Sequence, residues 1–259
     1  TLDDIKNLGY KTDRQNRLSK NNFNGFIEDF PIAKDIINPN KEFKENCKSI
    51  ELLFQLTQSE MTRQSFLFES GKIDNTIIEA YLFFAIELKN DNYSRTQLSD
   101  FTREINKVFP MPVMVLFKYD NFLTLSVIKR RLHKRDEGRD VLEKITLIKD
   151  INISIPHRAH IEILYDLSFD KLQSDFEFRN FVELHNAWQK ALDSSELNKR
   201  FYKEIANWYF WAVDKVEFPD DDEKDREKRN SVNIIRLLTR LIFVWFLKEK
   251  DNLIPNDLF

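Results

Sequence analysis

The residues best suited to chemistry lie where a long apolar run ends in an acidic and a basic side chain. Residues 83–86 are Phe-Phe-Ala-Ile, and Glu87 and Lys89 follow with one leucine between them. Side chains alternate along a strand, so Glu87 and Lys89 would share a face if this segment is extended. Together with Asp74 upstream, Glu87 would form a pair of carboxylates, a ligand set that suits Mg²⁺. Such a metal would stabilise charge on a scissile phosphate, and Lys89 would orient the attacking water.

Two features of this candidate site stay open. Either Glu69 or Glu79 could replace Asp74 as the first acid, because no turn is visible between Asp74 and the apolar run. The Glu87–Lys89 pair could also be a solvated ion pair at the end of a strand. Gln97, which lies in the next expected helix, is a further candidate that would support the site from that helix.

A basic stretch at residues 129–139 is the second candidate for function. Each cation that contacts a phosphate adds affinity for nucleic acid, and salt weakens that affinity by counterion release. The alternative is a solvated loop. Arg130 and Arg131 are the preferred contacts because a guanidinium matches phosphate oxygens well. The candidate DNA-binding residues are Lys129, Arg130, Arg131, Lys134 and Arg135.

His157 and His160 are spaced as metal ligands would be on a helix, with Glu162 after them. Pro156 and the strand expected before it disfavour such a helix, so capping or hydrogen bonding to the sheet is the preferred role. The aromatic residues between Phe201 and Trp211 could stack bases, but their helical spacing favours packing in a core.

The composition excludes several classes of protein. The chain has 259 residues, of which only 4 are glycine, and these are too scattered for a dinucleotide fingerprint or a phosphate-binding loop. The single cysteine, Cys47, excludes an internal disulfide and a cysteine-based zinc site, and it fits a reducing cytoplasm. The apolar run Leu241–Leu247 is too short to span a bilayer, so no membrane partner is expected. The net charge of -3 requires any DNA contact to be a local basic patch.

The elements that would position the site follow from periodicity. Residues 46–60 have apolar positions that predict a helix with Ser49 as its N-cap. Residues 77–89 are almost wholly apolar and predict either a buried pair of strands or a buried helix. A helix is expected to begin after Ser94, with one face formed by Leu98, Phe101, Ile105 and Val108.

Further strands and helices complete the expected organisation. Strands are predicted at 113–117, 123–128 and 145–155, the first two joined by a turn at 119–121. From about residue 175 the pattern is helical. The predicted fold is α+β, with a small mixed sheet flanked by helices and then an all-α subdomain. Its expected segments are an irregular segment with short helices at 1–45, an α/β domain at 46–174 and a helical connector at 175–259.

The candidate site resembles that of the PD-(D/E)XK nuclease family, whose core is a helix, a small sheet and a second helix. Asp74 would correspond to the family's Asp, and Glu87 and Lys89 to its E-x-K. The run Gln97-Leu-Ser-Asp-Phe101 is similar to the Q-x-x-x-Y element of type I restriction R subunits, with Phe101 in place of Tyr. The resemblance implies that Asp74 and Glu87 hold Mg²⁺ and that Lys89 and Gln97 assist catalysis.

A second resemblance spans residues 45–259. The segments 109–117, 130–136, 142–150, 156–160 and 230–247 resemble the amino-terminal region of large type IIG-like restriction–modification polypeptides, some of which are labelled type I restriction enzyme R proteins. In that family a nuclease module, a helical connector and an N6-adenine methyltransferase share one chain. The resemblance implies a Mg²⁺-dependent endonuclease acting on double-stranded DNA, with a methyltransferase domain beyond Phe259. The alternative is a module of the same parent enzyme that binds DNA or docks a domain without cutting.

Overall fold

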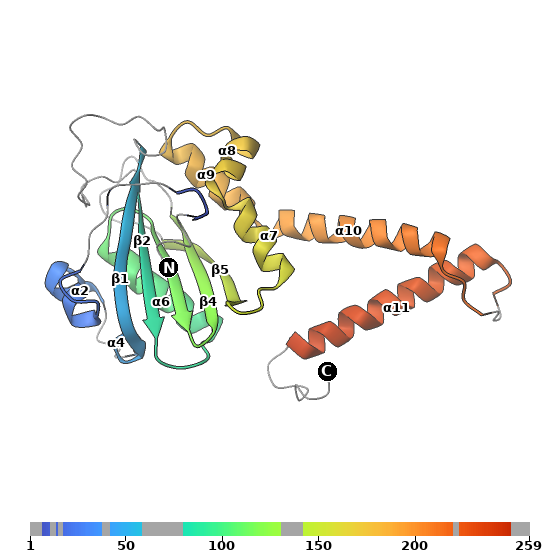
Figure 1. The fold of residues 1–259 in the computed structure, drawn as a ribbon, viewed down its shortest axis with the longest axis horizontal. Helices are drawn as coiled ribbons and strands as arrows, with labels where there is room; N and C mark the ends of the chain where they lie inside the picture. Colours follow the sequence, from blue (N-terminus) through green and yellow to red (C-terminus); the bar gives the residue numbers. More distant parts are fainter. Residues whose placement is uncertain are drawn as a thin grey trace. The chain divides into compact units, whose positions relative to one another are not determined.

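The first part of the chain is built on one mixed five-stranded sheet in this computed structural model (Figure 1). The structure describes residues 7–10, 14, 18–37, 42–58, 80–130, 142–219 and 223–249. Neighbouring strands are antiparallel except β2 and β3, which are parallel. In sheet order, the strands are β1 (Cys47–Thr57), β2 (Ala80–Leu88), β3 (Val113–Tyr119), β4 (Phe122–Arg130) and β5 (Leu142–Asn152). The predicted α+β class and mixed sheet are therefore confirmed.

β2 is buried on both faces, which explains its uninterrupted apolar sequence. Leu82 and Phe84 point into one hydrophobic core, whereas Tyr81 and Phe83 point into the other. The sequence left a strand pair and a helix open for residues 77–89. The structure resolves this as a single strand over Ala80–Leu88.

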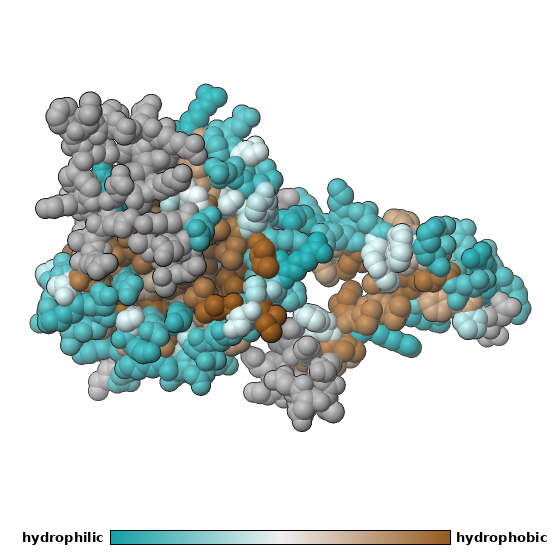
Figure 2. All heavy atoms as spheres, viewed as in Figure 1, coloured by the Kyte–Doolittle hydropathy of each residue, from teal (hydrophilic) through white to brown (hydrophobic). Residues whose placement is uncertain are grey.

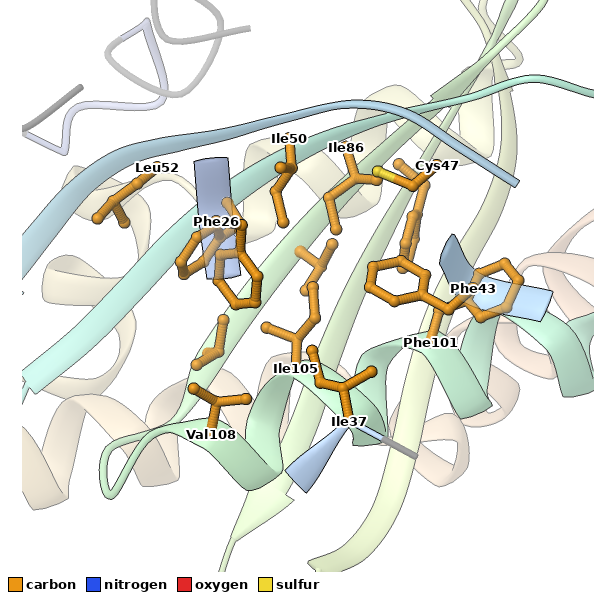
Figure 3. Close-up of a cluster of buried hydrophobic side chains, with 14 of the residues drawn as sticks. Phe26, Ile37, Phe43, Cys47, Ile50, Leu52, Ile86, Phe101, Ile105 and Val108 are labelled. Atoms are coloured by element: carbon orange, nitrogen blue, oxygen red, sulfur yellow. The ribbon is translucent and has the colours of Figure 1, made fainter. Parts of the chain in front are cut away.

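α6 (Arg95–Val108) connects β2 to the parallel strand β3 and covers one face of the sheet. Its inward residues are those that the spacing predicted, since Leu98, Phe101, Ile105 and Val108 are all buried. Figure 3 shows Ile105 and Phe101 of this helix beneath Ile50 of β1 in the same core.

Three short helices close this core at the amino-terminal side. Each contributes one buried residue to it: Phe26, Ala33 and Phe43. Short helices were predicted for residues 1–45, and the described part of that segment contains them. The helices are α2 (Phe23–Asp29), α3 (Ala33–Ile36) and α4 (Glu42–Asn46), the last reaching one residue past the expected segment.

The other face of the sheet is covered by helices at the end where β2 begins (Figure 1). The ring of Phe181 lies 4.9 Å from that of Tyr81, and Trp188 belongs to the same core. These helices therefore belong to the sheet's own compact unit, which extends to Leu192. The boundary that the sequence placed near residue 175 therefore differs from the end of this unit at Leu192. The covering helices are α7 (Arg158–Asp166), α8 (Phe169–Phe176) and α9 (Phe181–Ala191).

The second compact unit, Asp193–Phe259, contains two long helices in its described part, α10 (Ser194–Lys215) and α11 (Arg226–Glu249). Ala212 and Ile234 are buried, whereas most apolar side chains of both helices are exposed, as the brown surface in Figure 2 shows. Among the described residues, the stretch Arg226–Leu247 of α11 is long and apolar enough to cross a membrane. This stretch contains Arg236 and Arg240, and charged side chains are costly inside a bilayer. Its length and composition are therefore weak evidence for a membrane span.

The prediction of a helix over residues 46–60 was wrong, because Cys47–Thr57 form strand β1. The pairing with β2 is irregular between Leu52 and Phe54, which marks a β-bulge. Before the bulge, Ile50 and Leu52 point into the core beneath α6, and after it Phe54 points into the opposite core. The bulge interrupts the period of two that identifies a strand and leaves apolar residues three and four apart, a spacing typical of a helix.

Candidate functional site

Glu87 lies near the end of β2, on the sheet face that α8 and α9 cover at the other end of the strand (Figure 1). Its neighbours in register are Ser49 on β1 and Lys118 on β3. The carboxylate accepts a hydrogen bond from Lys48, whose Nζ lies 3.0 Å from Oε1. The Glu87 side chain is 32% exposed and Lys118 is exposed, so this part of the face is open to solvent.

The surroundings of Glu87 favour its ionised form. The hydrogen bond from Lys48 is the main cause that lowers its pKa below the ordinary value. The positive charges of Lys48 and Lys118 and a hydrogen bond from Ser49 act in the same direction, and partial burial opposes them. The site therefore presents a carboxylate anion between two cations at neutral pH.

Lys89 is held elsewhere. β2 ends at Leu88, and the Lys89 backbone N–H donates to the carbonyl of Asn46 at 3.0 Å. Its ammonium donates to the carbonyl of Glu45 at 2.6 Å. Both carbonyls belong to the last turn of α4, where a positive charge interacts favourably with the helix dipole. In the described geometry the lysine that contacts Glu87 is thus Lys48 and not Lys89.

Gln97 has a defined structural role at the start of α6. Its backbone N–H donates to the Ser94 hydroxyl at 3.2 Å, and its Oε1 accepts from the Ser94 N–H at 2.9 Å. This reciprocal pair is a capping box, and it confirms Ser94 as the predicted N-cap. The remaining amide group donates to Glu42 of α4 at 2.9 Å, which ties the two helices together.

The first acid of the expected metal site falls outside the described residues. This holds for Asp74 and for both of its alternatives, Glu69 and Glu79. In the part of the chain that the structure describes, no three His, Cys, Asp or Glu side chains are grouped to hold a metal. Glu87 still fits one position of a Mg²⁺ shell, because it is ionised and accessible, and Mg²⁺ commonly takes one or two carboxylates together with waters and phosphate oxygens.

The basic stretch is described only where it begins. Lys129 and Arg130 form the end of β4, with Arg130 opposite Leu142 of β5. Arg131, Lys134 and Arg135 lie outside the described residues. Because β4 runs antiparallel to β3 and therefore to β2, the structure places the start of this stretch at the end of the sheet opposite Glu87, and the DNA contacts stay predictions.

Of the two histidines after β5, His157 caps a helix and His160 lies within that helix. His157 is the N-cap of α7, and its Nδ1 accepts from the Ala159 N–H at 3.3 Å. This agrees with the capping role preferred from the sequence, whereas the helix that Pro156 was expected to disfavour is present as Arg158–Asp166.

Sequence reasoning missed Lys48 and Lys118. Lys48 was assigned to a helix, so its position beside Glu87 across two paired strands could not be read. Lys118 was detectable, because it is the one charged residue in the strand Val113–Tyr119.

Comparison of the chain with protein-family models, with curated proteins and with solved structures finds no match.

Proposed function

We propose that this chain is the DNA-cleaving module of a restriction–modification polypeptide and hydrolyses phosphodiester bonds with Mg²⁺. The observation that carries the proposal is the accessible carboxylate of Glu87 near the end of β2, with Lys48 Nζ at 3.0 Å and Lys118 opposite it on β3. An anionic oxygen ligand next to ammonium groups is what a site for a hard cation and a phosphate requires.

The chemistry assigns a role to each group. Glu87, with a second acid such as Asp74, would hold the metal, which when bound supplies positive charge against the phosphate oxygens. A water oxygen bonds to phosphorus as the bond from phosphorus to one sugar oxygen breaks. One proton of the water ends on that sugar oxygen, and the neighbouring ammonium groups stabilise the negative charge of the phosphate.

Double-stranded DNA is the proposed substrate, held by the basic stretch that begins at the end of β4, opposite Glu87, so the duplex would lie along the sheet to reach both. Lys129 and Arg130 start this stretch, and Arg131, Lys134 and Arg135 continue it. Contacts of this kind act on the phosphate backbone and carry no sequence information. The recognition of a target sequence is thus assigned to another part of the parent polypeptide, as is N6-adenine methylation.

The test is Mg²⁺-dependent cleavage of supercoiled plasmid DNA by the wild type and by Glu87→Gln. Loss of one metal ligand should abolish cleavage while the far-ultraviolet circular dichroism spectrum stays unchanged. The matched control is Glu28→Gln, because Glu28 also pairs with a lysine, Lys20 at 3.1 Å, but lies on α2. Cleavage by Glu87→Gln at the wild-type rate would show that Glu87 is not part of the catalytic site.

A second candidate is a module of the same parent that binds DNA or a neighbouring domain and cuts nothing. It is favoured by the structural partners of Lys89 and Gln97, which both contact α4. The exposed apolar side chains of α11 would suit docking of the proposed methyltransferase domain. DNA binding that persists with Mg²⁺ or Mn²⁺ without any nicking would select this candidate over the first.

A further inference from the structure

We propose that Lys48, and not Lys89, is the lysine that acts with Glu87 on the phosphate. This inference rests on the proposed nuclease function and names a residue that the E-x-K pattern does not contain.

The first argument is the contact itself. Lys48 Nζ donates to Glu87 Oε1 at 3.0 Å, from a strand that is separate in sequence but adjacent in the sheet. Its side chain is 59% exposed, so the ammonium is accessible to a ligand as well as to the carboxylate. The irregular pairing between Cys47 and Ser49 lies at this point of β1, which places Lys48 in a bulge next to the residue opposite Glu87.

The second argument is that Lys89 is anchored away from the carboxylate. Its backbone and its ammonium each donate to a carbonyl of α4, at 3.0 Å from Asn46 O and 2.6 Å from Glu45 O. Turning the ammonium towards Glu87 would break the second of these bonds. The alternation that predicted a shared face for Glu87 and Lys89 ends with the strand at Leu88.

The third argument is charge. Glu87 carries one negative charge, and Lys48 and Lys118 together carry two positive charges, so this group of three retains an excess cation. Lys48 donates a hydrogen bond to the carboxylate, so its proposed role is that of a hydrogen-bond donor and not of a general base. A cation held by Glu87 competes with Lys48 for the carboxylate. Lys48 would then donate to a non-bridging oxygen of the scissile phosphate.

The experiment compares Lys48→Met with Lys89→Met in the full chain, with Lys20→Met as the control for loss of a surface lysine. Loss of one donor that stabilises developing charge should lower kcat for plasmid cleavage by roughly 10²–10³-fold in Lys48→Met. Lys89→Met should lose far less, and Lys48→Arg should recover part of the rate. Lys89→Met losing more rate than Lys48→Met would overturn the inference and leave the nuclease function standing.

A readout that does not depend on activity separates the two proposals further. The pKa of Glu87, followed by NMR of its carboxyl carbon, should rise in Lys48→Met and stay in place in Lys89→Met. A Glu87 pKa that responds only to Lys89 would contradict the geometry and the inference together. A wild type that nicks no DNA with Mg²⁺ or Mn²⁺ would refute the nuclease function and, with it, the role of Lys48, even if the Lys48–Glu87 coupling is observed.

Discussion

At the scale of single residues, the pair formed by Lys48 and Glu87 combines a structural contact with a candidate chemical one. Both side chains are partly in water, with exposures of 59% and 32%, so the pair adds little to stability. Ion pairs of this kind are screened by salt and require two flexible side chains to be ordered.

This small contribution has a defined dependence on pH. Lys48→Met should lower the free energy of unfolding by roughly 0.2–1 kcal/mol at neutral pH. The pKa of Glu87 is lowered in the folded state, so its stabilisation is present above the unfolded value of about 4.3 and is lost as the pH falls through the folded value. Urea unfolding of both proteins from neutral pH downwards measures this difference. A difference that stays constant at acidic pH would show that the effect comes from something other than this pair.

At the scale of elements, the predictable parts of the fold are those in which local and tertiary signals agree. The buried face of α6 follows from the spacing of its apolar residues, and the hairpin turn between β3 and β4 follows from Asp120 and Asn121 between two strand patterns. β1 could not be predicted, because its bulge disrupts the alternation on which strand prediction depends. The candidate site was predictable only at Glu87. The side chains around Glu87 come from strands whose pairing no local pattern reveals.

The capping box of α6 gives a direct test of how local interactions hold the β2–α6–β3 unit. Ser94→Ala removes the oxygen that accepts from the Gln97 N–H, and it should cost about 1 kcal/mol of stability. Ser94→Asp should retain most of that stability, because aspartate is an equally good N-cap. Urea unfolding of the two variants beside the wild type provides the comparison. Equal stability of Ser94→Ala and the wild type would mean that the cap contributes nothing measurable.

At the scale of the whole molecule, the chain consists of two compact units, Thr1–Leu192 and Asp193–Phe259. Every residue of the two hydrophobic core clusters in the described ranges lies in the first unit. The described part of the second unit keeps many large apolar side chains in contact with solvent, among them Phe210 and Phe243. Surfaces of this kind mark sites where proteins meet other proteins.

This division predicts that residues 1–192 fold without the rest of the chain. The fragment should unfold in urea in one cooperative transition, because it contains both complete cores. A fragment of residues 1–175 is the matched control, and it should lose this transition because it lacks Phe181, Leu184 and Trp188. Equal folding of the two fragments would place the boundary near 175, where the sequence suggested it.

The bulge in β1 also determines which changes in chain length the fold can tolerate. Because the strand changes face near Leu53, its first half belongs to one core and its second half to the other. Deleting the extra residue, Leu53, would remove the bulge and leave Leu52 and Phe54 opposite Phe84 and Phe83 on the faces that they have now. A deletion between Phe54 and Thr57, where the pairing is regular, would instead turn the side chains that follow it towards the wrong layer.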